Sequence, residues 1–188
     1  MDKNLIKLHI SDARNFHIHG MYDEAIATLN LIRNSKLDRE DKIELYKLLS
    51  FNYRKLGQYE TALYNINIAI QSAKQESQDE QDIRKYAICL MNKGVIYDEQ
   101  NKFVQAIACY EQAVNLLISL YESTQNEYGI IINALINLGS AYYNSKQYPR
   151  AKEILQKALN YFGDEKQNDR RYLAIVSTLN EPNIKSLD

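Results

Sequence analysis

Apolar residues along this chain recur at spacings of three and four, which place them on one face of an α-helix. Four segments share one pattern: residues 19–29, 56–66, 100–110 and 145–155. In each, a turn residue is followed by an aromatic or similar side chain and then by an alanine, and the four alanines are Ala25, Ala62, Ala106 and Ala151. The pattern predicts four helices that begin just after four turns.

A second apolar pattern lies upstream of each turn. Seven residues before the turn stands a small residue, in order Ala13, Ser50, Gly94 and Gly139. Four residues before the turn stands an aromatic residue, in order Phe16, Tyr53, Tyr97 and Tyr142. The predicted unit is therefore a helix, a short turn and a second helix. One such hairpin cannot bury both of its apolar sides, so neighbouring hairpins must stack.

With these offsets the chain resembles the tetratricopeptide repeat (TPR) family, most clearly in LMNKGVIYDEQNKFVQAIACYEQAV (90–114) and LINLGSAYYNSKQYPRAKEILQKAL (135–159). The resemblance covers about residues 6–165. It implies an all-α, right-handed α-solenoid of about four helix-turn-helix hairpins plus a C-terminal capping helix. We expect one TPR domain over 1–188, with repeats at about 6–39, 43–76, 87–120 and 132–165.

The repeats are longer than the 34 residues of the family unit. The turn residues Gly20, Gly57, Asn101 and Lys146 lie 37, 44 and 45 residues apart. The additional residues fall at 74–87 and 120–133, which contain no proline and are rich in helix formers or charge. We expect helix extensions that meet at a turn. In this respect the chain is similar to kinesin light chains and to bacterial peptide-pheromone receptors.

The last repeat needs a cover, because a stack of hairpins leaves its final apolar side open. The segment 169–180 is the predicted capping helix. We expect its inner face to be formed by Tyr172, Leu173, Ile175, Val176 and Leu179. Residues 181–188 are expected to form a loose tail.

Charge and composition exclude several classes of function. The net charge of −1 gives no basic field for a nucleic acid. No run of 18 apolar residues is present and the N-terminus has no secretory pattern, so we expect no membrane insertion. Cys89 and Cys109 lie in helical patterns without metal-ligand spacing, as expected for buried thiols of a cytoplasmic protein.

No arrangement of residues points to catalysis. His17 and His19 lie two residues apart, so they do not share a helix face, and His9 has no carboxylate at a matching offset. Asp98 and Glu99 suit solvated acids at a helix end rather than a general acid–base pair. No glycine-rich phosphate loop is present. We therefore expect no enzymatic activity, no catalytic residue, no cofactor and no metal site.

The first helix of each hairpin keeps one face free of the predicted core. The resemblance implies that these faces line the concave groove in which the family usually binds partners. The candidate groove residues are Lys7, Arg14, Lys47, Phe51, Arg54, Met91, Asn92, Val95, Asn133, Asn137 and Tyr143. The first two repeats are basic on this face, which suits acidic residues in a partner. The last two repeats carry apolar and amide side chains, which indicate a binding patch unless they pack inside the stack.

Asn92 and Asn137 occupy the same repeat position. An amide offers a donor and an acceptor to a peptide backbone, and in kinesin light chains asparagines at this position hold peptides. The alternative is that asparagine is simply common at this position. The clamp that grips the acidic tails of heat-shock chaperones is absent, because Ile10, Leu48 and Met91 stand where it needs polar or basic groups.

Three functions are compatible with the sequence. The first is a protein- or peptide-binding scaffold or adaptor that uses the groove. The second is the peptide-sensing module of a bacterial quorum-sensing type regulator, without its output domain. The third is a structural, self-associating TPR protein.

Overall fold

The structure is a computed structural model that describes residues 2–74, 79–124, 128–162 and 169–186. Within these ranges every regular element is a helix and none is a strand, which confirms the predicted all-α class. The chain divides into two compact units, Met1–Ile96 and Tyr97–Asp188. Each unit is described by itself.

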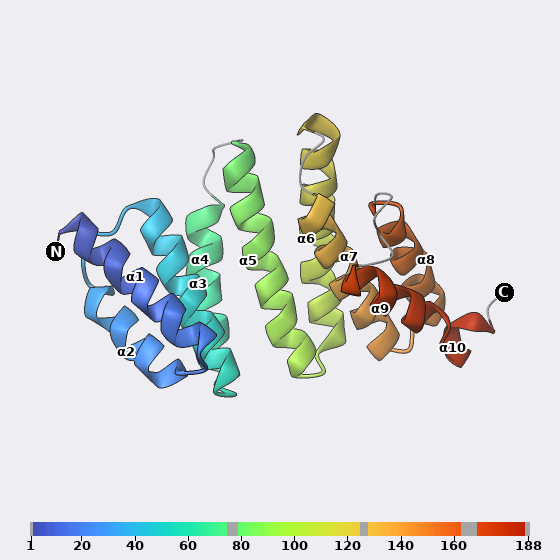
Figure 1. Ribbon diagram of the computed structural model, residues 1–188, viewed down its shortest axis with the longest axis horizontal. Coiled ribbons are helices and arrows are strands. Elements are labelled where there is room, and N and C mark those ends of the chain that lie inside the picture. Colours follow the sequence, from blue (N-terminus) through green and yellow to red (C-terminus); the bar gives the residue numbers. More distant parts are fainter. Residues whose placement is uncertain (1, 75–78, 125–127, 163–168, 187–188) are drawn as a thin grey trace. The chain divides into compact units, whose positions relative to one another are not determined.

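The first unit holds two helical hairpins and most of a fifth helix (Figure 1). Helices α1 (Lys3–Ile18) and α2 (Tyr22–Ile32) form the first hairpin, and α3 (Arg39–Lys55) and α4 (Tyr59–Ala73) form the second. Both α1 and α2 pack against α3. Helix α5 (Glu80–Glu99) adds Cys89 and Ile96 to the core formed by α3 and α4.

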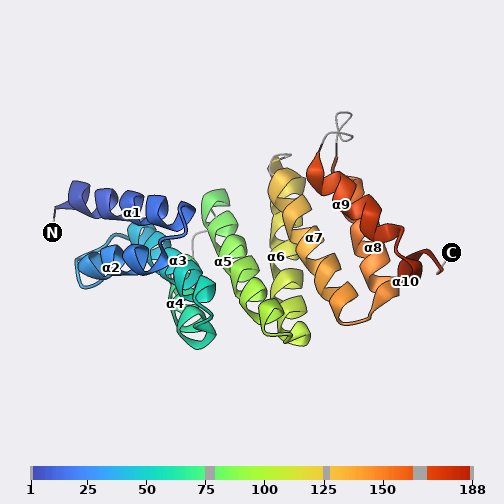
Figure 2. The ribbon, with the colours of Figure 1, turned by 60° about the horizontal axis from the view of Figure 1, so that its bottom comes forward.

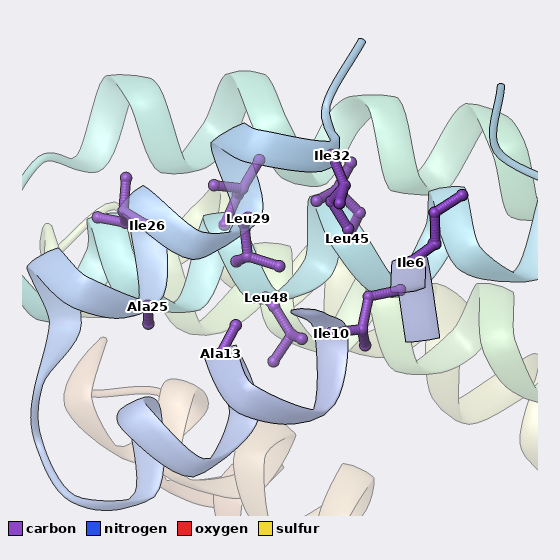
Figure 3. Close-up of a cluster of buried hydrophobic side chains, with 10 residues drawn as sticks. Ile6, Ile10, Ala13, Ala25, Ile26, Leu29, Ile32, Leu45 and Leu48 are labelled. Carbon is purple, nitrogen blue, oxygen red and sulfur yellow. The ribbon is translucent and has the colours of Figure 1, made fainter. Parts of the chain in front are cut away.

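Residues spaced three and four apart build the core between the first two hairpins (Figure 3). Helix α1 contributes Ile6, Ile10 and Ala13, and all three are buried. Helix α2 contributes four buried residues, and Leu45, Leu48 and Leu49 of α3 close the cluster. Burial of such side chains stabilises the unit by about 1.5–3 kcal/mol for each large aliphatic residue.

The second unit contains α6 (Phe103–Thr124), α7 (Tyr128–Asn144), α8 (Tyr148–Leu159), α9 (Arg170–Leu179) and the short α10 (Pro182–Lys185). Helix α7 packs between α6 and α8, and α9 packs on α8. In Figure 2, α7, α8 and α9 lie side by side. Pro149 lies in the first turn of α8, where its missing N–H costs nothing.

All four predicted turns have the same geometry. Gly20, Gly57, Asn101 and Lys146 have φ values of 75°, 72°, 57° and 62°. In each turn the next residue donates its N–H to the carbonyl of the aromatic residue five positions earlier, as in Met21 N to Phe16 O at 2.9 Å and Gln147 N to Tyr142 O at 2.9 Å. This is the Schellman motif, which closes the end of the first helix and redirects the chain.

The helices after these turns are oriented as the sequence predicts. Ala25, Ala62, Ala106 and Ala151 have no solvent exposure. Ala13 and Ser50 also have none, and Gly94 and Gly139 are buried. In the first, second and fourth repeats, small residues therefore lie where the two helices of the repeat pack together.

The additional residues of the long repeats lengthen helices. Helix α5 has 20 residues and α6 has 22, against 11 in α2. The predicted turns within these inserts, and the predicted repeat ends at 75–76 and 163–165, lie outside the described residues.

Two expectations for the C-terminus are wrong. Leu173 is exposed rather than on the inner face of α9, because it lies about 200° around the helix from the buried Ile175. Tyr172, Val176 and Leu179 are half-buried on the side of Ile175, as expected. The predicted loose tail contains α10, whose Ile184 is fully buried against the end of the stack. Pro182 starts this helix.

One segment of α6, Phe103–Glu122, is long and apolar enough by length and composition to cross a membrane, and no other described helix is. In the structure 44% of this window is buried inside the protein. Its exposed positions include Gln105, Glu111, Gln112 and Asn115. A helix with one buried apolar face and one polar face has the pattern of a core helix.

Candidate functional site

The free faces of α1, α3 and α5 enclose a hollow of about 380 Å³ within the first unit. Each helix contributes residues spaced three and four apart, so that one face of each helix lines the cavity. Lys7, Ser11 and Arg14 come from α1, and Lys85 and Ile88 from α5. We call this cavity the α1–α3–α5 hollow.

A three-residue charge cluster lies on the wall of the hollow. Arg14 Nη2 donates to Glu44 Oε1 at 2.7 Å, and Lys47 Nζ lies 2.5 Å from Glu44 Oε2. Burial opposes ionisation of Glu44, but the charges and hydrogen bonds of Lys47 and Arg14 outweigh it and lower the pKa of the carboxyl. Two cations therefore share one carboxylate, and the cluster carries a net positive charge.

Two further acids lie at the end of the hollow where α3 begins. Glu40 pairs with Lys85 of α5 at 2.5 Å. Burial and the nearby Asp38 carboxylate raise the pKa of Asp41. Lys7 is exposed, and it makes no hydrogen bond or ion pair with any part of the chain that the structure describes. The hollow thus combines four basic side chains with three acidic ones.

The floor of the hollow is apolar. Ile10 and Ile43 are nearly buried, Ile88 is half-buried and Cys89 has no exposure. Burial raises the pKa of the Cys89 thiol to about 12, so the group stays protonated at neutral pH and is no nucleophile. The floor therefore offers packing rather than chemistry.

Arg39 and Asp82 fix α5 against the second hairpin. Arg39 Nη1 lies 2.5 Å from Asp82 Oδ2. The same guanidinium donates to Ser72 O and Ala73 O, each at 2.9 Å, at the C-terminal end of α4. One side chain thus joins α3, α4 and α5, and it holds in place the α5 segment that closes the hollow.

Of the predicted groove residues, Lys7, Arg14 and Lys47 line the hollow. Phe51 is half-buried against the core, and its ring centroid lies 6.0 Å from that of His17. Arg54 is half-buried as well. Neither Phe51 nor Arg54 lines the hollow.

The predicted residues of α5 lie on its half-buried side. Met91, Asn92 and Val95 are each partly exposed. The amide nitrogen of Asn92 is itself buried, and it has no hydrogen-bond partner among the described residues. Asn92 therefore has a donor that the fold does not use.

The predicted residues of α7 belong to the second unit, where one of them is already engaged. Asn133 Oδ1 accepts a hydrogen bond of 3.2 Å from Arg171 Nη1 of α9, and the same nitrogen donates to Gly129 O at 3.2 Å. Asn137 is half-buried. The Tyr143 ring packs edge-on against Tyr148, with 5.4 Å between centroids.

Sequence reasoning missed Lys85, Glu40 and Arg171. Lys85 falls in an insert, where the repeat pattern does not predict which way a side chain faces. Arg171 donates a hydrogen bond to Asn133, which lies 38 residues earlier in the chain. No group of three His, Cys, Asp or Glu side chains within the described ranges could hold a metal ion.

Comparisons with known proteins agree with this architecture. Two models described as tetratricopeptide repeat match residues 41–119 and 131–160, together more than half of the chain. No curated protein sequence matches the chain at a significant level.

Several solved structures have the same fold. Nearly identical TPR-like repeats of a kinesin light chain from Podosopora anserina align at a TM-score of 0.73 and 16% identity, over 93% of this chain and 84% of that one. The apo form of RapI aligns at 0.75 and 16%, over 93% of this chain but 47% of RapI. BtubC from P. vanneervenii aligns at 0.61 and 20%, over 93% and 70%.

Proposed function

Because the chain belongs to the tetratricopeptide repeat family, we propose that it is a protein- or peptide-binding scaffold that uses the free faces of its first helices. The α1–α3–α5 hollow carries this proposal. A cavity of about 380 Å³ with an apolar floor and convergent charged groups is of the size and chemistry of a ligand site. Its cysteine is protonated, Glu44 and Glu40 are paired with cations, and Asp41 is buried, so the hollow suits binding rather than catalysis.

The amide residues on the same helix faces support the proposal. Asn92 keeps an unused amide donor, and Asn137 occupies the same repeat position in α7. The Asn92 amide nitrogen is itself buried, so it reaches a peptide carbonyl only when the side chain turns outward, and this turn breaks no hydrogen bond of that nitrogen. Asn133 is a weaker candidate, since Arg171 already occupies its oxygen.

The test starts from the partner. Material that copurifies with the protein from its native host is identified by mass spectrometry, and its affinity is measured by calorimetry. Replacing Asn92 and Asn137 with alanine should weaken binding about tenfold while the unfolding transition is retained. Unchanged affinity would remove the asparagine face from the proposal.

The same experiment separates the alternatives. A short linear peptide would favour a sensing module of a quorum-sensing type regulator, which the long helices α5 and α6 also suit. A folded protein would favour an adaptor in the cytoplasm. Light scattering over a range of concentrations tests the third alternative, self-association.

A further inference from the structure

We propose that Tyr121 and Tyr128 are a site of oxidative modification, at which one-electron oxidation couples their rings into an intramolecular dityrosine. The new bond joins the end of α6 to the start of α7, at the ends of these helices that lie away from the Schellman turns. The proposal rests on the geometry of the second unit alone and does not depend on the proposed binding function.

The phenol groups of Tyr121 and Tyr128 are in direct contact. The Tyr121 hydroxyl donates a hydrogen bond of 2.9 Å to the Tyr128 oxygen, and the two ring centroids lie 4.8 Å apart at an interplanar angle of 57°. The ortho carbons of a phenol flank its hydroxyl, so two phenols that meet through their oxygens also bring these carbons close together. Dityrosine forms through a bond between two ortho carbons.

Other tyrosine pairs of the second unit meet in a different way. The centroids of Tyr121 and Tyr161 lie 5.6 Å apart at 77°, and those of Tyr143 and Tyr148 lie 5.4 Å apart at 66°. Such edge-on contacts are a favourable way to pack two rings. Their larger separations and steeper angles make them poorer pairs for coupling, and the structure therefore singles out Tyr121 and Tyr128.

The exposed member of the pair is Tyr128. Its side chain is 46% exposed, whereas Tyr121 is half-buried beside it. The hydrogen bond to Tyr128 raises the pKa of the Tyr121 phenol, so this phenol is protonated at neutral pH and acts as the donor. A radical formed on Tyr128 can take a hydrogen atom from Tyr121 along this hydrogen bond, which leaves Tyr128 ready for a second oxidation.

The reaction balances with hydrogen peroxide as the oxidant and a haem peroxidase as the catalyst. Each phenol loses one electron and its hydroxyl proton and becomes a phenoxyl radical. The two radicals combine at their ortho carbons, and the hydrogen on each joined carbon then moves to its ring oxygen. In total two C–H bonds break and one C–C bond forms. The two electrons and two protons that leave convert one peroxide molecule into two water molecules.

Coupling within one chain is the expected outcome. Two groups that are already held in contact react in an internal step, which is much faster than a step that needs a collision between two molecules. The cross-link should therefore form at micromolar protein concentration. It would join the second helix of the third repeat covalently to the first helix of the fourth.

The test treats the full chain with hydrogen peroxide and a haem peroxidase and isolates single chains under denaturing conditions. Cleavage after glutamate places the two residues on fragments 112–122 and 128–153, and Tyr121 is the only tyrosine of the first fragment. We expect dityrosine fluorescence and a joined fragment whose mass is two hydrogen atoms below the sum of its parts. Tandem mass spectrometry should locate the bond between Tyr121 and Tyr128.

Three variants locate the reaction. Tyr121→Phe should lower the dityrosine yield of single chains about tenfold, because phenylalanine has no hydroxyl to oxidise and the held contact between two phenols is lost. Tyr143→Phe removes one phenol of an edge-on pair and should leave the yield unchanged. Tyr161→Phe, which removes the other phenol in contact with Tyr121, should also leave it unchanged. Circular dichroism verifies that the variants fold.

Three results would overturn the proposal. The first is dityrosine that appears only between chains, or not at all. The second is a joined fragment in which Tyr121 is bonded to a tyrosine other than Tyr128. The third is an equal yield from the Tyr121→Phe and Tyr143→Phe variants.

Discussion

Gly139 of α7 lies directly against Leu155 of α8. A Cβ atom built on Gly139 would come within 2.6 Å of Leu155 Cδ2 and 2.7 Å of Leu155 Cγ. Leu155 is itself buried and cannot swing away into solvent. The absence of a side chain at position 139 is therefore what allows these two helices to pack.

Gly139→Ala is expected to destabilise the protein by about 1–2 kcal/mol. Overpacking costs about 1–3 kcal/mol, and the better helix propensity of alanine offsets it only in part. Urea denaturation measures the change. Gly129→Ala on the same helix is the control, because its nearest contact would be Arg171 Nη1 at an ordinary 3.8 Å. Equal stability of the two variants would contradict the close approach.

Lys146→Gly is expected to stabilise the turn between α7 and α8 by about 1 kcal/mol. Lys146 has a φ of 62°, a left-handed conformation that costs a residue with a side chain about 1–2 kcal/mol. Gly57→Ala, at the equivalent turn with a φ of 72°, should lower stability by a similar amount. Both changes in stability are read from the midpoint of thermal unfolding. The midpoint should rise for Lys146→Gly and fall for Gly57→Ala, and shifts in the same direction would contradict the prediction.

Arg39→Met is expected to lower the free energy of unfolding by about 2–3 kcal/mol. The substitution removes the ion pair of Arg39 with Asp82 and the donor that Arg39 gives to the carbonyl groups of Ser72 and Ala73. Lys3→Met is the comparison, since the Lys3–Asp38 pair is 64% and 42% exposed and should contribute much less to stability than the Arg39–Asp82 pair. A loss below 0.5 kcal/mol for Arg39→Met, on the order of a surface substitution, would show that α5 is held by apolar packing alone.

Native Cys89 is expected to resist thiol reagents. With its pKa raised from 9.0 to about 12, the thiolate fraction at pH 8 falls about a thousandfold, and burial slows access further. The measurement uses the Cys109→Ser variant, in which Cys89 is the remaining thiol, and compares its reaction rate with an aromatic disulfide in native and urea-unfolded protein. A native rate within tenfold of the unfolded rate would mean that the floor of the hollow opens.

The sequence predicts the hairpins well because their determinants are local. The aromatic residue, the turn residue and the following alanine lie within ten positions of one another, as Phe16, Gly20 and Ala25 do. Helix periodicity then places each side chain on the correct face. The exception is Leu173, a large apolar residue on a helix with only one fully buried position. Its hydrophobicity alone placed it on the predicted inner face of the capping helix.

The candidate site is less predictable, because it depends on pairs far apart in the chain. Spacing alone assigns Lys7 and Arg14 to one helix face, and the resemblance to tetratricopeptide repeats adds Lys47 to the same groove. The pairing of Lys85 with Glu40 spans 45 residues, and it follows from how α5 is anchored by Arg39 and Asp82. The engagement of Asn133 by Arg171 likewise depends on where the capping helix docks.

The recurring Schellman bends have a consequence for how such chains diversify. All four keep the same hydrogen bonds although glycine, asparagine and lysine occupy the same left-handed position. The turn is thus set by backbone geometry, while the helices on either side vary in length from 11 to 22 residues. The helices could be lengthened or exchanged at the ends away from the turns without redesigning the turns. This makes the chain a practical starting point for building recombined repeat proteins.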